Sequence, residues 1–241
     1  MFKRLFGGHR NKVYKTNGFV KVIWKDGFRR QNQIREGVSL ENFVATHIDI
    51  KARMLVDKSK PVEEEDGGLV TYFHYAEGEI RYPWNLDEIA SAAKLLTRFH
   101  QHLKAWPSPR GPGLIRQLHL DFARGNVLFQ PGSSNAIGVI DFETTAIGPV
   151  EQDLGRTLSF ILVDSPINLN REDPLRSILQ GSSFFERWNT LLTNYSLTFR
   201  KDKVINWTLR YLTDEDYGSL NYIRDKAISW LHDSVVNNLT I

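Results

Sequence analysis

The feature that most constrains this chain is a polar stretch that leads directly into a pair of short apolar runs. Residues 118–129 read Leu-His-Leu-Asp-Phe-Ala-Arg-Gly-Asn-Val-Leu-Phe, and turn-forming residues follow at 131–135. A second apolar run, 137–140, ends directly before Asp141. Two β-type runs joined by turn residues predict a hairpin. Such a hairpin brings the polar stretch at its start beside Asp141 at its end.

Three oxygen-bearing side chains converge at that end of the predicted hairpin, namely Asp121, Asn126 and Asp141. Mg²⁺ prefers oxygen ligands and typically takes one or two carboxylates together with substrate phosphates. Asn126 and Asp141 suit that role, and Asp121 is then free to accept a proton from an attacking hydroxyl. Phosphoryl transfer requires little more than positioning, metal charge and a group that orients the nucleophile. The pattern therefore predicts a Mg²⁺-dependent phosphoryl-transfer site.

The N-terminal part of the chain is predicted to be rich in β-structure. Residues 12–16 and 19–24 flank Asn17-Gly18, and two β-type runs joined by Asn-Gly are the strongest short-range signal for a hairpin. A helix is expected over roughly residues 37–54. A strand is expected over residues 69–75, where β-branched and aromatic residues gather.

The rest of the chain is predicted to be mainly helical. Asn85 with Glu88 three residues later resembles a capping box, and apolar residues then recur at helical spacing. His100 in this helix is expected at the surface or partly buried, and the acidic residues 63–66 before it are expected to form an exposed loop. From Asp153 onward the pattern is again mostly helical. The outline is an α+β chain with a small β-rich N-terminal lobe and a larger helical C-terminal lobe that contains the hairpin.

Composition narrows the class of protein further. Among 241 residues, 41% are apolar and 24% are charged, which is ordinary for a globular protein and excludes a disordered chain. Thirty-one Lys and Arg residues against 28 Asp and Glu residues give a net charge of +3, an excess too small to predict a nucleic-acid partner. No apolar run approaches the length of about 18 residues that a membrane span needs. The absence of cysteine, and of an apolar segment suited to export, favours a cytoplasmic protein.

The polar stretch resembles the catalytic segment of the aminoglycoside phosphotransferase and choline kinase family, the small-molecule branch of the protein-kinase-like fold. Its His-x-Asp, the Asn five residues later and the Asp141-Phe142 pair have the spacing of the kinase catalytic loop and metal-binding segment. The resemblance extends over roughly residues 3–160. The other segments that resemble the family are the Gly-rich nucleotide loop at Gly7-Gly8, the strand with a phosphate-binding cation at Val20-Lys21-Val22, the linker between lobes at 75–79, the end of the first large C-lobe helix at 95–100, and Gly148-Pro149 with Asp153.

This resemblance implies a two-lobed protein-kinase-like fold, with the N-lobe over residues 1–78 and the C-lobe over residues 79–241. It implies that ATP, or alternatively GTP, binds between the lobes together with Mg²⁺. The partner it implies is a small molecule whose hydroxyl group accepts the γ-phosphate. The sequence carries no indication of oligomeric state.

The resemblance also implies a role for each candidate residue. Asp121 is expected to be the catalytic base, and Asn126 and Asp141 are expected to bind Mg²⁺. His119 and Asp153 are expected to support the catalytic loop. The expected nucleotide-binding residues are Gly7, Gly8, Lys21, Glu36, Tyr75 and Glu77, with Glu36 as the ion-pair partner of Lys21.

Three assignments have alternatives at this stage. Lys25 competes with Lys21 as the phosphate-binding cation, although the position of the Asn-Gly turn favours Lys21. Glu41 competes with Glu36 as the partner of that cation. Glu143 is expected either to assist metal or substrate binding or to form a surface ion pair.

Two other functions share parts of this pattern. A nucleotide-binding module without turnover would keep the fold, but the intact Asp121, Asn126 and Asp141 favour an active enzyme. A metal-dependent hydrolase would use the same carboxylates without the Gly-rich segment. The acceptor itself is not predicted, because fold family alone does not select a substrate. Aminoglycosides, choline-like amines, thiamine, sugars and homoserine-like amino acids all fit.

Overall fold

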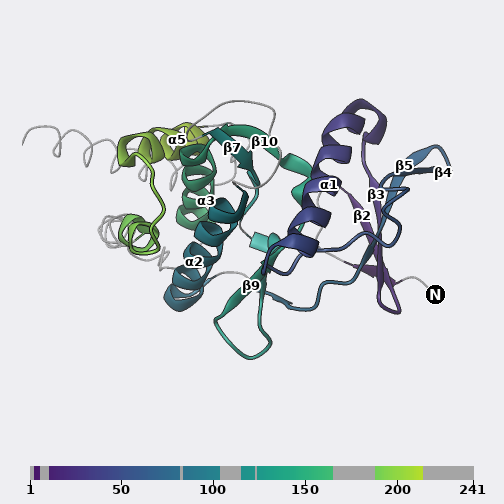
Figure 1. Cartoon of the computed structure of the whole chain (residues 1–241), viewed down its shortest axis with the longest axis horizontal. Helices are drawn as coiled ribbons and strands as arrows, with labels where there is room; N and C mark the ends of the chain where they lie inside the picture. The colour runs from purple at the N-terminus through teal and green to yellow at the C-terminus, as the bar shows by residue number, and fades with distance from the viewer. Residues whose placement is uncertain are drawn as a thin grey trace, which may run out of the picture.

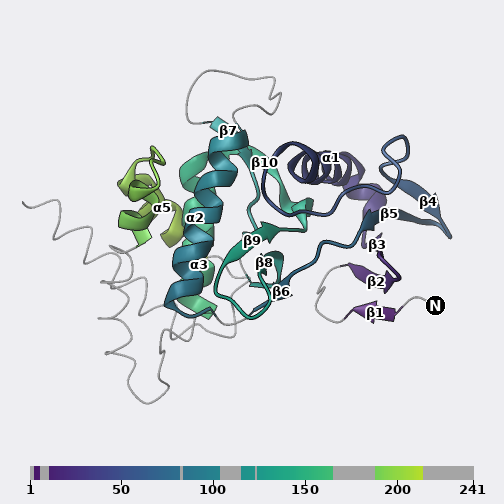
Figure 2. The ribbon, with the colours of Figure 1, turned by 60° about the horizontal axis from the view of Figure 1, so that its bottom comes forward.

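The structure is a computed structural model that describes residues 3–5, 11–81, 84–103, 115–122, 124–164 and 188–213 (Figure 1). A small antiparallel sheet with one long helix forms one part of the molecule, and a mainly helical part with a hairpin forms the other (Figures 1 and 2). The predicted α+β class with a small β-rich lobe and a larger helical lobe is confirmed. No helix in the described residues is long and apolar enough to cross a membrane.

The small sheet has five strands in the order β1-β2-β3-β5-β4, and every neighbouring pair is antiparallel. The strands are β1 (Lys3–Leu5), β2 (Lys12–Thr16), β3 (Phe19–Trp24), β4 (Glu63–Glu65) and β5 (Gly68–His74). The predicted β2–β3 hairpin is confirmed, and Gly18 in its turn has a φ of +80°, a conformation that glycine adopts without strain. Residues 63–65 form an edge strand, so the prediction of an exposed acidic loop there was wrong.

Helix α1 (Gln31–His47) covers one face of this sheet, after a short 3₁₀ turn η1 (Gly27–Arg30). Its buried Ile34 and Val38 lie on the sheet side, in one apolar cluster with the buried β3 residues Val20 and Val22. The buried Leu40 belongs to the apolar cluster of the helical part. The helix expected over 37–54 was misplaced at both ends, because α1 begins at Gln31 and ends at His47. Its first turn is made of polar residues that conceal the start, and the chain turns extended directly after the helix because it pairs there with strands of both parts.

The extended segment 48–55 connects the two parts of the molecule through backbone hydrogen bonds. The amide of Lys51 donates to the carbonyl of Ile137 (2.9 Å), and the amide of Val139 donates back to Lys51 (2.8 Å). Four residues further on, Leu55 forms a bridge with Phe73 of β5. Arg53, between these two attachments, is therefore held in a fixed position between the sheet and the hairpin.

The helical part begins with α2 (Leu86–His102), whose predicted capping box is confirmed. The amide of Glu88 donates to the side chain of Asn85 (3.0 Å), and the Glu88 carboxylate accepts from the Asn85 amide (2.8 Å). The second predicted hairpin is also present, as β8 (Val127–Phe129) and β9 (Ala136–Val139). The chain before α2 adds the short strand β6 (Glu79–Ile80) beside β8.

The remaining described residues hold two further strands, two further helices and a helical segment at 188–194. Strand β7 (Ile115–Leu118), directly before the catalytic segment, pairs with β10 (Ala146–Pro149), directly after the hairpin region. Short 3₁₀ turns, η3 (Arg124–Asn126) and η4 (Phe142–Thr144), lie at the two ends of the hairpin. Helices α3 (Val150–Asp164) and α5 (Lys201–Thr213) pack together. Both ends of the hairpin are thus fixed by elements that surround the catalytic segment.

Candidate active site

Asp121 and Asn126 meet in the loop between β7 and β8. The side-chain nitrogen of Asn126 donates to the Asp121 carboxylate (2.8 Å) and to the Asp121 carbonyl (3.0 Å). The amide of Ile140, next to Asp141, donates to the carbonyl of Asn126 (2.9 Å). The hairpin therefore brings the three predicted side chains to one end, as the sequence pattern requires.

The loop that carries Asp121 is anchored by a buried carboxylate on α3. Asp153 accepts from the amides of His119 (2.9 Å) and Leu120 (2.8 Å), and Leu120 is held at a φ of +59°. Nε2 of His100 lies 3.1 Å from Asp153, and both side chains are fully buried. Burial alone would raise the pKa of Asp153, but hydrogen bonding to His100 and to the His119 amide lowers it. His100 is thus a core residue, and the expectation of a surface or partly buried position was wrong.

His119 links the Asp121 loop to the strand that ends at Asp141. Its Nε2 donates to the carbonyl of Ile140 (3.2 Å), while its Nδ1 accepts from the amide of Asp121 (3.2 Å). Those two bonds require the neutral ring with its proton on Nε2. Burial lowers the pKa of His119 against the opposing effect of Asp153 and Asp121, which agrees with a neutral imidazole. This geometry is consistent with the supporting role expected from the sequence.

Asp141 has a left-handed backbone, with φ 69° and ψ 68°, at the point where the chain leaves β9 for η4. Burial, together with the nearby carboxylates of Glu143, Glu41 and Asp121, raises the pKa of Asp141 to about 7, although Arg53 opposes the shift. The Asp141 side chain is 31% exposed, and a partly exposed carboxylate among other carboxylates is an environment that a divalent cation stabilises. The residues present therefore fit a Mg²⁺ site.

The donor set of this site is small. The side-chain nitrogen of Asn126 donates to Asp121, which leaves the side-chain oxygen of Asn126 for a metal. Asp141 supplies carboxylate oxygens. Within the described residues, no three His, Cys, Asp or Glu side chains form a metal-binding group of their own. Two protein ligands with substrate phosphates completing the shell is the arrangement that Mg²⁺ commonly takes with nucleotides.

Glu143 is a buried partner of the N-terminal part of the chain. Its carboxylate accepts from the Asn11 side chain (2.6 Å) and from the Arg30 guanidinium (3.3 and 3.4 Å). Glu143 is 5% exposed, so the expected surface ion pair was wrong. The η4 turn is thereby tied to the start of β2 and to the residue before α1.

Lys21 does not form the predicted ion pair with Glu36. Lys21 bonds with Glu65 (2.6 Å) on the face of the sheet opposite α1. Lys25 and Glu36 are exposed. Glu41, the second choice for the acidic partner, is buried on α1, but its partner is not a β3 lysine.

The partner of Glu41 is Arg53, which sequence reasoning did not identify. Nε of Arg53 donates to one carboxylate oxygen of Glu41 (2.6 Å) and Nη2 donates to the other (2.8 Å). The same Nη2 lies 3.8 Å from Asp141. Burial alone would lower the pKa of Arg53, but Glu41 raises it. No local sequence signal identifies Arg53, because its position depends on the bridges at either end of segment 48–55.

The other expected nucleotide-binding residues are only partly described. Tyr75 lies in the linker after β5, where its amide donates to Gly18 (2.8 Å) and the Lys15 Nζ lies 3.3 Å from its ring centre. Glu77 is exposed in the same linker. Gly7 and Gly8 lie outside the described residues.

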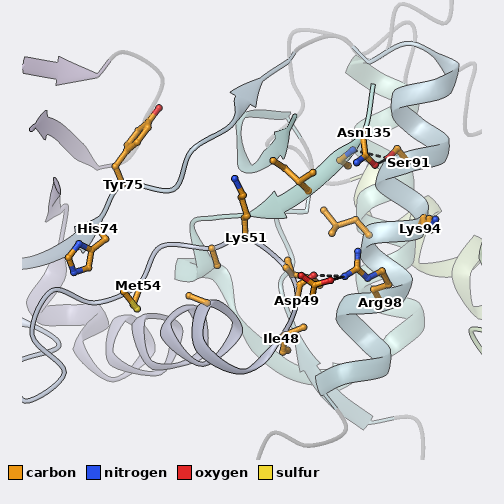
Figure 3. A pocket seen from close by; sticks show the side chains of 16 residues that line it. Ile48, Asp49, Lys51, Met54, His74, Tyr75, Ser91, Lys94, Arg98 and Asn135 are labelled. Carbon is orange, nitrogen blue, oxygen red and sulfur yellow. Dashed lines mark hydrogen bonds and ion pairs between the residues drawn. The ribbon is translucent and has the colours of Figure 1, made fainter. Parts of the chain in front are cut away.

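A separate pocket of about 700 Å³ lies outside this cluster (Figure 3). Its walls come from segment 48–54, the end of β5, helix α2 and the β8–β9 turn. Arg98 of α2 donates to the Asp49 carboxylate (2.9 Å) on one wall, and Lys51 contributes to another. Asp121, Asn126 and Asp141 do not line it, so this pocket is distinct from the candidate active site.

Comparison with known proteins supports the assignment made from the motifs. Residues 76–173 match the model of the phosphotransferase enzyme family. The structure of a microcompartment-associated aminopropanol kinase is similar, with a TM-score of 0.66 and 13% identity over 96% of this chain and 89% of that chain. None of the curated proteins compared with the chain matches it.

Two aminoglycoside phosphotransferases are also similar in structure. The GDP complex of aminoglycoside 2'-phosphotransferase-IIIa has a TM-score of 0.58 and 16% identity, over 99% of this chain and 93% of that chain. A thermostable mutant of aminoglycoside phosphotransferase APH(4)-Ia, in a ternary complex with AMP-PNP and hygromycin B, has a TM-score of 0.57 and 12% identity, over 97% and 94%. The chain therefore has the kinase-like fold of the aminoglycoside phosphotransferases, and its central segment matches the phosphotransferase enzyme family that its motifs resemble.

Proposed function

We propose that this protein is a small-molecule kinase that transfers the γ-phosphoryl group of ATP or GTP to a hydroxyl group. The observation that carries the proposal is the cluster at the ends of the β8–β9 hairpin. There Asn126 bonds to Asp121, and the backbone pairing beside Asp141 fixes the third side chain against them. Phosphoryl transfer needs a group that orients the nucleophile and metal charge at the phosphates, and this cluster can supply both.

Each residue of the cluster has a part in the proposed reaction. Asn126 and Asp141 would hold Mg²⁺, which supplies positive charge to the β- and γ-phosphates. Asp121 accepts the proton of the acceptor hydroxyl while the oxygen of that hydroxyl bonds to the γ-phosphorus. The bond from that phosphorus to the bridging oxygen breaks, and the nucleoside diphosphate leaves. The bond from Asn126 orients the Asp121 carboxylate for this step.

The comparisons support the class of nucleotide and acceptor. The similar structures include complexes with GDP and with AMP-PNP, and their names describe kinases of aminopropanol and of aminoglycosides. Aminopropanol and aminoglycosides both carry hydroxyl and amine groups. We therefore expect the acceptor here to be a small molecule with a hydroxyl group, and amino alcohols are the first compounds to test.

The experiment is a screen for acceptor-dependent ADP or GDP production in the presence of Mg²⁺. The panel contains amino alcohols, aminoglycosides, choline, thiamine, sugars and homoserine. Asp121→Asn should lower turnover by about 10²- to 10⁴-fold, the usual contribution of a general base, while nucleotide affinity is retained.

Two outcomes would contradict the proposal. Phosphate release from phosphoesters without any nucleotide would indicate a hydrolase. An Asp121→Asn variant with full activity on the best acceptor would remove Asp121 from the base role.

A further inference from the structure

The most unusual group near the proposed active site is the buried guanidinium of Arg53. Its side chain is 6% exposed, and it lies between Glu41 of α1 and Asp141 at the end of the hairpin. Its central carbon also lies 4.5 Å from the ring centre of Phe73. A cation fixed by a carboxylate on one side and an aromatic ring on another has little freedom to reorient.

The donors of Arg53 are only partly used within the protein. A guanidinium carries five N–H donors, and Glu41 occupies Nε and one edge of Nη2. The distance of 3.8 Å from Nη2 to Asp141 is too long for a hydrogen bond. Nη1 makes no hydrogen bond to any of the described residues. Donors therefore remain on a cation that lies 3.8 Å from the proposed magnesium ligand Asp141.

The lysines predicted for phosphate binding lie elsewhere. Along β3 the buried residues Val20 and Val22 alternate with Lys21, so Lys21 is on the opposite face from α1. There it is paired with Glu65 at 2.6 Å. Lys25 is exposed beyond the end of the strand. Of these three cations, only Arg53 contacts Asp141.

We propose that Arg53, oriented by Glu41, binds the phosphate groups of the nucleotide in the place predicted for Lys21. The proposal rests on the proposed function. Nucleotide phosphates that share a metal with Asp141 would lie beside the unused donors of Arg53. Arginine suits such a position because its planar group contacts carboxylate and phosphate at the same time. The cation thus comes from the chain after α1, and not from the sheet.

The test compares Arg53→Met with Lys21→Met, which removes the cation that the sequence favours. Binding of Mg·ATP, Mg·GTP, adenosine and guanosine is measured by calorimetry. Arg53→Met should weaken binding of the triphosphate by about 10- to 100-fold, as expected for lost hydrogen bonds to a charged group, with nucleoside affinity unchanged. Lys21→Met should stay within about twofold of the wild type for all four compounds.

A double variant separates phosphate binding from structural damage. Arg53→Met alone leaves Glu41 buried without a partner, whereas Glu41→Leu with Arg53→Met replaces the pair by apolar groups, a change that proteins often tolerate. The double variant should show the same selective loss of triphosphate binding. Wild-type affinity for the triphosphate in the double variant would overturn the proposal, because the loss in the single variant would then come from the unpaired Glu41.

The remaining outcomes also have defined meanings. If the wild type binds Mg·ATP or Mg·GTP and Arg53→Met binds it equally well, the role of Arg53 is refuted while the proposed function stands. The same conclusion follows if Lys21→Met is the variant that loses triphosphate affinity. If the wild type binds neither nucleotide, the proposed function fails, and the role of Arg53 fails with it.

Discussion

At the scale of single residues, the buried His119 connects protonation to the geometry of the loop that carries Asp121. Its two ring nitrogens bond to the backbone on both sides of the site, and only the neutral ring satisfies both bonds. Protonation would place a donor against the Asp121 amide, which is itself a donor. The folded protein therefore resists protonation of His119, which agrees with its lowered pKa.

This resistance predicts a pH dependence of stability. The pKa of His119 is lower in the folded state than the value of about 6.5 expected in the unfolded chain. Below that value the unfolded state binds a proton that the folded state excludes, so the free energy of unfolding should fall as the pH falls. The contribution is at most about 1.4 kcal/mol per pH unit.

Urea unfolding of the wild type and of His119→Gln at pH 7.5, 6.0 and 5.0 measures this contribution. Gln has no titrating group. The free energy of unfolding of the variant should therefore fall less steeply with falling pH than that of the wild type, by up to about 1.4 kcal/mol per pH unit, whatever its stability at pH 7.5. Identical slopes in the two proteins would show that His119 is not responsible.

Residues in the local motif could be predicted from the sequence, and residues placed by tertiary structure could not. The spacing of Asp121, Asn126 and Asp141 is enough to bring them together once the hairpin forms, and they do converge. Arg53 has no comparable spacing, because two backbone bridges to distant strands position it. Lys21 was predicted from its place on a strand, but packing of Val20 and Val22 against α1 puts Lys21 on the opposite face of the sheet.

At the scale of elements, α1 approaches η4 so closely that only glycine fits at the contact. A Cβ atom at Gly37 would lie 2.3 Å from the backbone oxygen of Phe142. The same helix carries Glu41 one turn further on, and therefore also positions Arg53. The contact at Gly37 sets the distance between α1 and the end of the hairpin.

We expect Gly37→Ala to displace α1 from η4, even though alanine is the better helix former by about 1 kcal/mol. Nucleotide affinity should fall by about tenfold or more, since the Glu41–Arg53 pair moves with the helix. Ser39→Ala, at an exposed position of α1, is the matched control and should bind the nucleotide as the wild type does. The measurement is calorimetric binding of Mg·ATP or Mg·GTP, and an unchanged affinity in Gly37→Ala would contradict the role given to this contact.

Elements with strong local signals were predicted well, and those that depend on distant partners were not. The Asn-Gly hairpin, the capping box of α2 and the catalytic hairpin all form where their residues predict them. Strands β7 and β10 were missed, because each is stabilised by the other across the hairpin and not by a local signal. The end of α1 was misplaced for the same reason, since segment 48–55 is extended only through its pairing with β5 and β9.

At the scale of the whole molecule, the two parts are joined by contacts beside the proposed active site. Glu143 bonds to Asn11 and Arg30 of the N-terminal part, and Lys51 is paired with β9 of the helical part. Arg53 and Asp141 lie between these attachments. A ligand that binds at this junction would contact both parts, which is the arrangement expected for a nucleotide between two lobes.

The most direct test of the account is calorimetric binding of a non-hydrolysable ATP or GTP analogue, with Mg²⁺ and with EDTA, to the wild type and to Asp141→Asn. We expect one equivalent to bind to the wild type only when Mg²⁺ is present. Asp141→Asn should weaken that binding by about tenfold or more, because the variant loses a charged metal ligand. If the affinity of the wild type for the analogue is the same with EDTA as with Mg²⁺ and is also unchanged in Asp141→Asn, that result would contradict a magnesium–nucleotide site at the hairpin. The absence of binding of either analogue to the wild type would contradict it too.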